Sequence, residues 1–371
     1  MKVIAIVFGG NSVEHDISIL TGLHAARHVP HGMRAILVYL TRDGRFLTSG
    51  RRGVLSKIDN YIAGVSRASE CFFSGGRIYK KCGIRRSRKI DAVLNCCHGG
   101  PGEDGRLAGM LEILGVPVTS CDSRAAATLQ SKSRTREVLT SNGFAQPPYM
   151  NVGGGERIKF PSFMEGWRAD RRDGVVVKPD TLGSSIGITV VRDEGQFESA
   201  LELAFSLDDS AIAEKYLESA DEINCSAFRY GNTLMVSACE VIRRDGEVFD
   251  YDSKYLDAAS GFVHAAPKKS GRDENSHPKE QEIRELTKKA YQLFDCKGVV
   301  RVDFLVVGDA VYLNEINTVP GFLSYHLWQK AGLPYATLIE MLVRQAQKDA
   351  ETGKKTVFQS EILQKNRNLV D

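Results

Sequence analysis

The sequence lacks the features that direct proteins to membranes, to the cell exterior or to nucleic acid. No apolar run approaches the roughly 20 uninterrupted residues of a membrane-spanning helix. The apolar part of residues 1–10 is too short for the core of a signal peptide. The formal net charge of the 371 residues is only +3, so no global basic excess points to nucleic acid. We therefore expect no membrane partner and no nucleic-acid partner.

The eight cysteines include no C-x-x-C pair. Such pairs are typical of structural zinc sites, and regularly spaced cysteines are typical of disulfide-bonded extracellular domains. Most of these cysteines lie in apolar, strand-like segments or in loops. The pattern argues against a zinc site and a disulfide framework, and it favours a reducing, cytoplasmic compartment.

The N-terminal part predicts an open, parallel α/β sheet. Val3 to Phe8 is a continuous apolar run, typical of a buried parallel strand, and a Gly-rich turn and a helix over residues 14–28 follow it. Residues 34–40 and 92–97 predict further strands, and this first unit ends near Cys121.

Two polar side chains follow strands of that sheet. Ligands gather beyond the carboxyl ends of parallel strands, where Glu14 and His98 both fall. Glu14 could hold a substrate ammonium, although for this segment alone an acid that stabilises the helix start is the favoured interpretation. The loop after His98, residues 99–105, is rich in glycine, which indicates positive φ angles or a close approach to the backbone.

A second Gly/Ser loop lies between two predicted strands in residues 174–190. The first strand ends in Lys178, and Gly183 to Gly187 reads GSSIG. Backbone N–H groups and hydroxyls in such a loop can bind phosphate. The Walker A spacing is absent and no helix start follows, so the loop by itself is a weak signal.

The helical pattern over residues 123–142 contains Lys132, and a strand over residues 211–216 carries Glu214. Residues 242–275 form a long, weakly patterned segment, which inside a compact domain is often a lid. Residues 278–294 and 332–347 predict two long helices.

The rest of the chain is organised around two apolar runs in residues 299–327, which indicate a β-hairpin. The first strand carries Arg301 and Asp303, and the second carries Glu315 and Asn317. Side chains two residues apart point to the same face of a strand. If Asp303 faces Glu315, all four polar groups share one patch.

That pairing constrains the turn. A plain two-residue loop at Gly308-Asp309 would put Asp303 and Glu315 on opposite faces. The patch therefore requires an odd-length loop, such as Gly308 to Ala310, or a β-bulge. Two carboxylates and an amide oxygen are ligands suited to Mg²⁺, and the arginine could stabilise an oxyanion. A solvated hairpin face with an ordinary ion pair explains the patch alone equally well.

Seven segments, taken in order and spacing, resemble the D-alanine–D-alanine ligases of the ATP-grasp superfamily. The segments are Gly9-Gly10 with Glu14, HGGPGEDG at 98–105, VKPDTLGSSIG at 177–187, EKYL at 214–217, DYDSKY at 250–255, RVDF at 301–304 and NEINTVPG at 314–321. Each is weak alone, but their common order makes coincidence improbable.

The resemblance implies an α/β fold that becomes α+β in the C-terminal half, with four parts. These are an N-terminal open parallel-sheet substrate domain (1–122), a central ATP-grasp subdomain with the Gly/Ser phosphate loop (123–213), a C-terminal ATP-grasp subdomain with lid and metal site (214–350) and a charged tail (351–371).

The resemblance also implies roles for individual residues. Two Mg²⁺ ions, which Mn²⁺ could replace, would bind Asp303, Glu315 and Asn317. ATP would contact Lys132, Lys178, Ser184, Ser185 and Lys254 through its phosphates and Glu214, Lys215, Leu217 and Glu222 through adenine and ribose. The ammonium of the first D-alanine would bind Glu14, whose side chain would be linked to Ser184 and Tyr255. This substrate would lie near His98. Arg301 and the backbone N–H of Gly321 would form the oxyanion site.

The chain departs from the family pattern in two places. His326 stands where a serine for the second substrate's carboxylate is expected, and Ser324 is displaced by two residues. Either side chain could donate to that carboxylate, so D-serine or D-lactate remain possible acceptors. The spacing from Glu214 to Glu222 is also one residue longer than usual.

The resemblance favours an ADP-forming enzyme that makes D-alanyl-D-alanine through an acyl phosphate, for peptidoglycan precursor synthesis. A related ligase with another acceptor is the alternative. A nucleotide-binding regulator without catalysis is disfavoured, because the expected metal and phosphate side chains are all present. The resemblance further implies a cytoplasmic homodimer that pairs through the first domain.

Overall fold

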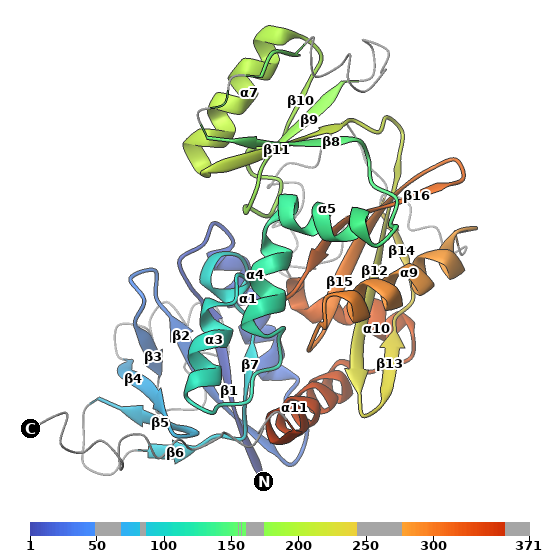
Figure 1. Ribbon diagram of the computed structural model, residues 1–371. Helices are drawn as coiled ribbons and strands as arrows, with labels where there is room; N and C mark the ends of the chain where they lie inside the picture. The colour runs from blue at the N-terminus through green and yellow to red at the C-terminus, as the bar shows by residue number, and fades with distance from the viewer. Residues whose placement is uncertain are drawn as a thin grey trace, which may run out of the picture.

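The computed structural model describes residues 1–48, 68–81, 87–154, 156, 158–160, 174–242 and 277–352. Three sheets with flanking helices make up this part of the chain (Figure 1). Most of the predicted lid, with Lys254 and Tyr255, and the tail from residue 353 lie outside these ranges. No helix within them is long and apolar enough to cross a membrane.

The N-terminal sheet is parallel only at one end. Its parallel strands are β1 (Lys2–Gly9), β2 (Met33–Leu40) and β7 (Ala92–Asn95), and β1 lies between the other two. Side chains from Ile4 to Phe8 are fully buried, as the apolar run predicts. Helix α1 (His15–Arg27) follows β1, and η1 (Gly100–Gly102) and α3 (Arg106–Ile113) follow β7.

Four short antiparallel strands extend this sheet beyond β2. They are β3 (Phe46–Thr48), β4 (Ser69–Ser74), β5 (Arg77–Lys80) and β6 (Ser87–Lys89). The predicted fold class is confirmed, and these added antiparallel strands make the N-terminal sheet mixed. Strand β4 buries Phe73 and exposes Phe72, so it covers the core with one face only, as strands of antiparallel sheets commonly do.

The predicted helix over residues 123–142 is two helices, α4 (Ser123–Gln130) and α5 (Lys132–Ser141). Ser131 separates them in an extended conformation, and its hydroxyl accepts a hydrogen bond from the Arg134 N–H. Serine is a preferred residue before a helix because its side chain satisfies an unpaired N–H group. Lys132 consequently begins α5 instead of lying inside a longer helix.

The central sheet is antiparallel. Its strands are β8 (Tyr149–Gly153), β9 (Val175–Pro179), β10 (Thr189–Val191) and β11 (Ser210–Lys215), in the order β10-β9-β11-β8. Helix α7 (Glu194–Leu207) packs Phe197 and Leu201 on one face of the sheet. The predicted domain boundary between residues 213 and 214 falls inside β11, and the division into domains stays a prediction.

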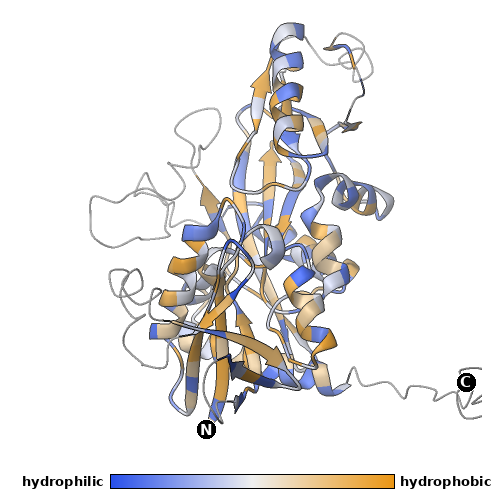
Figure 2. Ribbon diagram, turned by 90° about the vertical axis from the view of Figure 1, so that its left-hand side faces the viewer, coloured by the Kyte–Doolittle hydropathy of each residue, from blue (hydrophilic) through white to orange (hydrophobic). Residues whose placement is uncertain are grey.

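The C-terminal sheet is also antiparallel. Its strands are β12 (Asp221–Tyr230), β13 (Thr233–Val236), β14 (Glu240–Ile242), β15 (Val300–Val307) and β16 (Ala310–Asn317). Helix α9 (Glu280–Leu293) covers one face with Ile283 and Ala290. Figure 2 shows apolar residues along the strands of the three sheets.

The chain then returns to the N-terminal sheet through η3 (Gly321–Ser324), α10 (Tyr325–Lys330) and α11 (Tyr335–Thr352). Leu338 and Leu342 of α11 share one buried core with Ile4 and Leu94. Figure 1 shows α11 beside β1, so the last helix and the first strand support each other.

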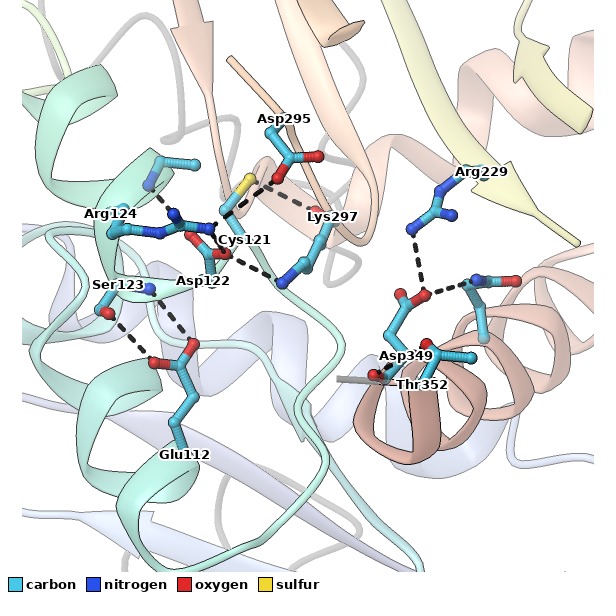
Figure 3. Close-up of polar contacts among 12 residues, drawn as sticks. Glu112, Cys121, Asp122, Ser123, Arg124, Arg229, Asp295, Lys297, Asp349 and Thr352 are labelled. Carbon is cyan, nitrogen blue, oxygen red and sulfur yellow. Dashed lines mark hydrogen bonds and ion pairs between the residues drawn. The ribbon is translucent and has the colours of Figure 1, made fainter. Parts of the chain in front are cut away.

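Polar contacts join the end of the N-terminal sheet to the start of β15 (Figure 3). The Lys297 ammonium lies 2.9 Å from the Asp122 carboxylate, and the Cys121 thiol donates to the Lys297 carbonyl at 3.3 Å. Next to them, Gly298 has φ +64, and a Cβ atom there would lie 1.9 Å from the Thr119 carbonyl oxygen. The junction therefore requires glycine at 298.

Replacing Gly298 with alanine should strongly destabilise the protein. The left-handed conformation costs an L-residue about 1–2 kcal/mol, and the backbone clash adds to that cost. Gly308→Ala is the matched control, because Gly308 also has positive φ but open space around it. We expect G298A to lower the free energy of unfolding in urea by more than G308A does, and equal losses would show that the contact with Thr119 is unimportant.

Candidate active site

The β15–β16 hairpin has the register that the sequence predicts. Asp303 pairs with Glu315 and Arg301 with Asn317. The loop is the short one, because Val307 pairs with Ala310, and a bulge between Asp303 and Phe304 shifts the register. The extra residue on β16 is Asn314, since Phe304 pairs with Leu313. The bulge thus brings the four polar side chains to one face.

A residue that the sequence analysis did not single out holds this bulge. Arg136 of α5 is only 2% exposed. Its guanidinium donates to the Leu313 carbonyl and, at 3.3 Å, to the Asn314 side-chain oxygen. It also donates to Glu214 Oε1 at 2.6 Å. Arg136 lies one helical turn after Lys132, on the same face of α5, and that spacing is the signal that could have revealed it.

Glu214 is buried between two cations. Its carboxylate forms ion pairs with Arg136 and with Lys178, and the Lys178 ammonium lies 3.3 Å from the Asn314 side-chain oxygen. Burial opposes ionisation of Glu214, but Arg136 and Lys178 outweigh it and lower the pKa to about 2. Here Glu214 and Lys178 contact each other, and the adenine and phosphate roles that the resemblance implied stay predictions.

Asp303 lies fully buried at the centre of the hairpin patch. Arg301 donates to it twice, from Nε to Oδ1 and from Nη2 to Oδ2, both at 2.7 Å, and Asn317 donates at 3.1 Å. Burial raises the pKa of Asp303 to about 6; Arg301 opposes the shift, and the nearby Glu315 and Glu222 carboxylates add to it. The patch therefore holds more negative charge than one arginine neutralises.

This charge and donor set fit a hard divalent cation. Carboxylate and amide oxygens are the ligands of Mg²⁺, which completes its shell with water and substrate phosphate. Within the described ranges no group of three or more His, Cys, Asp or Glu side chains is placed to hold a metal ion. A cation bound at Asp303 and Glu315 would take the Asn317 amide oxygen and substrate oxygens as its other ligands.

The Gly/Ser loop approaches the N-terminal sheet at Glu14. The Ser184 hydroxyl donates to Glu14 Oε1, so the predicted contact between these residues is present. A Cβ atom at Gly183 would lie 3.0 Å from Glu14 Oε2, and one at Gly99 would lie 2.8 Å from it. Ser184 and Ser185 have φ of 55 and 59. Glycines of two loops therefore make room for this carboxylate.

The loop is also held from α5. The Lys132 ammonium donates to the Asp180 carbonyl at 3.3 Å and to the Leu182 carbonyl at 2.5 Å. Burial lowers the pKa of Lys132, and the Glu315 carboxylate opposes the shift. Lys132 consequently lies between the phosphate-loop candidate and the hairpin patch, where a phosphate could bind.

His98 has both ring nitrogens occupied. Its Nδ1 lies 2.7 Å from the Val319 carbonyl, and its Nε2 lies 2.7 Å from the Thr21 hydroxyl. Burial lowers the pKa of His98 to about 4, so the ring is neutral at pH 7. Glu103 lies in the same loop, and its carboxyl oxygens accept hydrogen bonds from the Gly99 N–H and the Val319 N–H. Burial and the Glu14 carboxylate raise the pKa of Glu103 to about 8.

The segment after Pro320 has an unusual backbone. Phe322, Leu323 and Ser324 all have φ between 50 and 54. Ser324 is fully buried, and its hydroxyl has no hydrogen-bond partner in the described part of the chain. His326 is partly exposed, and its Nε2 lies 3.0 Å from Glu240 Oε2. Of the two candidates for the second substrate, His326 is the accessible one.

The positions of the remaining predicted residues do not decide their roles. Ser185, Lys215, Leu217, Glu222 and Gly321 lie in described segments, whereas Lys254 and Tyr255 do not.

The arrangement of two antiparallel sheets, a Gly/Ser loop and a carboxylate-bearing hairpin defines the ATP-grasp class of ligases.

Comparisons with known proteins narrow this class. A sequence model described as "D-ala D-ala ligase N-terminus" matches residues 3–121, and "D-ala D-ala ligase C-terminus" matches residues 138–344. The D-alanine–D-alanine ligase of Thermosipho africanus is 31% identical over 349 residues, which cover 92% of each chain.

Solved structures agree. The D-alanine–D-alanine ligase of Coxiella burnetii has a TM-score of 0.80 at 22% identity, over 95% of this chain and 97% of that one. The VanG D-Ala:D-Ser ligase of Enterococcus faecalis has a TM-score of 0.75 at 25% identity, over 93% and 99%. The chain belongs to the D-alanine–D-alanine ligase family.

Replacing Arg136 with methionine should destabilise the protein by about 3–5 kcal/mol, because it removes one partner of a buried ion pair. It also removes the donor to the bulge, so we expect ligase activity to fall with stability. Urea unfolding and activity at a temperature where the variant is folded measure both effects. Arg134→Met is the control, since Arg134 is exposed on the same helix and should change stability by less than about 0.5 kcal/mol.

The loss of stability caused by R136M should depend on pH. The folded pKa of Glu214, about 2, lies below its ordinary value of 4.5, so its ion pairs stabilise the fold fully above pH 4.5 and progressively less as the pH falls toward 2. The stability difference between wild type and R136M should therefore shrink over that interval. A difference independent of pH would contradict the assigned pairing.

Proposed function

We propose that the protein joins two D-alanine molecules to D-alanyl-D-alanine at the expense of ATP, with release of ADP and phosphate. The observation that carries this proposal is the bulged hairpin, which puts Arg301, Asp303, Glu315 and Asn317 on one face. The family membership supports the substrate, and the contact of Glu14 with Ser184 supports a site for its ammonium.

The chemistry follows from the poor reactivity of a carboxylate. The carboxylate of the first D-alanine attacks the γ-phosphorus of ATP, the bond to ADP breaks, and an acyl phosphate forms. The amine of the second D-alanine attacks the acyl carbon, phosphate leaves, and the amine loses a proton. Phosphoryl transfer depends mainly on positioning and charge stabilisation. A Mg²⁺ ion held by Asp303, Glu315 and Asn317, or Mn²⁺ in its place, would supply neutralisation of phosphate charge.

The side chains of this chain do the remaining work. Glu14, oriented by Ser184, binds the ammonium of the first D-alanine. Arg301 and the backbone N–H of Gly321 stabilise the oxyanion that forms when the amine attacks. His98 is neutral and hydrogen-bonded on both nitrogens, so we assign it to the wall of this site.

The nucleotide occupies the gap between the central and C-terminal sheets in this proposal. Its phosphates contact Lys132, Lys178, Ser184, Ser185 and Lys254, and its adenosine contacts Glu214, Lys215, Leu217 and Glu222. Lys178 is paired with Glu214, so a phosphate bound there would share the charge of Lys178 with that carboxylate. Tyr255 and Lys254 act from a lid, which excludes water from the hydrolysable acyl phosphate.

We also propose the wider setting. The division at residues 122, 213 and 350, a homodimer through the first domain, and a cytoplasmic step of peptidoglycan precursor synthesis follow from the family. The seven described cysteines are free thiols, which supports a reducing compartment.

For the second substrate we propose that His326 binds the carboxylate. Glu240 Oε2 lies 3.0 Å from the ring nitrogen Nε2 of this partly exposed side chain. His326 Nδ1 and the Ser324 hydroxyl are both buried without a hydrogen-bond partner among the described residues. The partial exposure of the His326 ring, against the complete burial of Ser324, is therefore what favours His326. D-Serine is the alternative acceptor, since the VanG ligase is a similar structure of 25% identity.

Phosphate release from ATP and Mg²⁺ tests the function directly. The protein is incubated with a panel of D- and L-amino acids and D-lactate, and the products are identified by mass. We expect rapid phosphate release with D-alanine alone and D-alanyl-D-alanine as the product. Activity that needs no D-alanine, or none with it, would exclude the proposal; a mixed product with D-serine would favour the alternative.

Glu315→Gln is the matched loss-of-function variant for this assay. It keeps the size of the side chain but removes its charge, so turnover should fall by at least a hundredfold, on the order of the loss of a major charge-stabilising group. Circular dichroism should be unchanged. A kcat near wild type would argue against the role of Glu315 in the metal site.

His326→Ala should raise the KM for the second D-alanine about tenfold or more, because a hydrogen bond to a charged group is lost. The KM for the first D-alanine should change little, and initial rates over a wide D-alanine range separate the two. His326→Ser restores the family's residue and should keep D-alanine as acceptor. If Ser324→Ala raised the KM for the second D-alanine and H326A did not, the carboxylate would be assigned to Ser324 instead of His326.

A further inference from the structure

Residues 318–322, which we call the oxyanion segment, are anchored by side chains far away in the sequence. Within it, a Cβ atom added at Gly321 would meet nothing within 4 Å. The peptide whose N–H is proposed to bind the oxyanion is therefore not positioned by packing around Gly321 itself. Its position depends on how the flanking peptides are held.

The peptide groups of Val319 are held on both sides. Its N–H donates to Glu103 Oε1 at 2.9 Å, and its carbonyl accepts from His98 Nδ1 at 2.7 Å. The Thr318 hydroxyl adds a bond to the Glu103 carbonyl at 3.3 Å. One end of the oxyanion segment is thus fixed to the loop that follows β7.

Thr21 of α1 fixes the other end. The Phe322 N–H donates to the Thr21 hydroxyl oxygen at 3.2 Å, and that hydroxyl lies 2.7 Å from His98 Nε2. The direction of this last bond follows from the first anchor. A carbonyl can only accept, so His98 carries its proton on Nδ1, and in the neutral ring Nε2 must accept. The Thr21 hydroxyl is the donor.

We propose that Thr21 is a positioning residue for the acyl-transfer step, because its hydroxyl connects the Phe322 N–H to His98 and so fixes the backbone N–H of Gly321. The inference rests on the proposed ligase function. Hydroxyl, imidazole and carboxylate then form one clamp, Thr21–His98–Glu103, that holds both ends of the oxyanion segment.

The backbone after Gly321 makes such a clamp necessary. Phe322, Leu323 and Ser324 adopt the left-handed conformation in sequence, which is unfavourable for L-residues with a Cβ atom. The Leu323 N–H donates to the Pro320 carbonyl at 2.8 Å across Gly321. Without a partner for the Phe322 N–H, that bond would be left to hold the turn, and the Gly321 peptide would be freer to rotate. A small displacement of an oxyanion donor is enough to reduce the rate strongly.

The clamp also links the site for the first substrate's ammonium to the oxyanion site. Thr21 is fully buried in α1, two helical turns after Glu14, which precedes the helix. The same rigid helix therefore sets the carboxylate for the first substrate's ammonium and the donor chain behind the oxyanion N–H.

Thr21→Val and Thr21→Ser test the proposal as a matched pair. Valine keeps the shape and removes the hydroxyl, whereas serine keeps the hydroxyl. We expect T21V to lower kcat for dipeptide formation about tenfold or more, a part of the loss seen when an oxyanion donor is removed. The KM for ATP should stay within twofold, and T21S should restore most of kcat.

A second readout separates positioning from general damage. If the amine attack is slowed, the acyl phosphate is lost to water more often, so T21V should release more than one phosphate per dipeptide. Thr287→Val is the control for burying a valine in place of a threonine. Thr287 is fully buried in α9, and its hydroxyl donates to the Ile283 carbonyl of its own helix at 2.8 Å. T287V should keep a ratio of one.

The proposal is overturned if T21V makes dipeptide within twofold of wild type, or if T21S and T21V lose activity equally. If T21V does not fold, Thr21→Ala tests the same hydroxyl. A wild-type enzyme that uses another acceptor would refute the proposed function instead, and the T21V/T21S comparison with that acceptor would still decide the role of Thr21.

Discussion

The contact of the Arg136 guanidinium with the bulge of β16 is the interaction on which the site depends. A regular hairpin with the two-residue loop at 308–309 would place Glu315 opposite the face that carries Asp303. The extra residue, Asn314, corrects the register, but a bulge leaves backbone groups without ladder partners. Arg136 supplies a donor to the Leu313 carbonyl inside the protein, where an unpaired carbonyl would be costly. The chemistry of the hairpin therefore depends on a helix from another part of the chain.

The charge of Arg136 has a second consequence. A buried guanidinium requires a carboxylate nearby, and Glu214 of β11 provides it. Glu214 in turn binds Lys178 of β9, so one group of charges connects α5, the central sheet and the hairpin. The ion pair with Glu214 holds the Lys178 side chain in place. It also keeps the lysine from being an isolated buried cation, which desolvation would make unfavourable.

The sequence analysis succeeded where chemistry and periodicity coincide. Alternation along two strands predicted that Arg301, Asp303, Glu315 and Asn317 share a face, and a parity argument predicted an odd loop or a bulge. Arg136 was not singled out, because its partners, the Leu313 carbonyl and Glu214, lie far from it in the sequence, and only its spacing from Lys132 signalled it. The break at Ser131 was missed because no glycine or proline marks it in residues 123–142. The antiparallel strands β4 to β6 were not predicted one by one, because they are short and most side chains of β5 and β6 are polar or basic. The roles of Lys254 and Tyr255 remain predictions.

The two anchoring systems have different physical characters. Arg136, Lys178 and Glu214 are charges, whose mutual attraction in a buried setting is strong but needs complete pairing. Thr21 and the neutral His98 form a chain of hydrogen bonds with defined direction, in which each group has one donor role and one acceptor role. Directional bonds fix the orientation of a peptide better than a point charge does. The charged group lies where phosphates are proposed to bind, and phosphates are stabilised by charge. The hydrogen-bond chain lies behind the proposed oxyanion site, where an N–H group must point at one position.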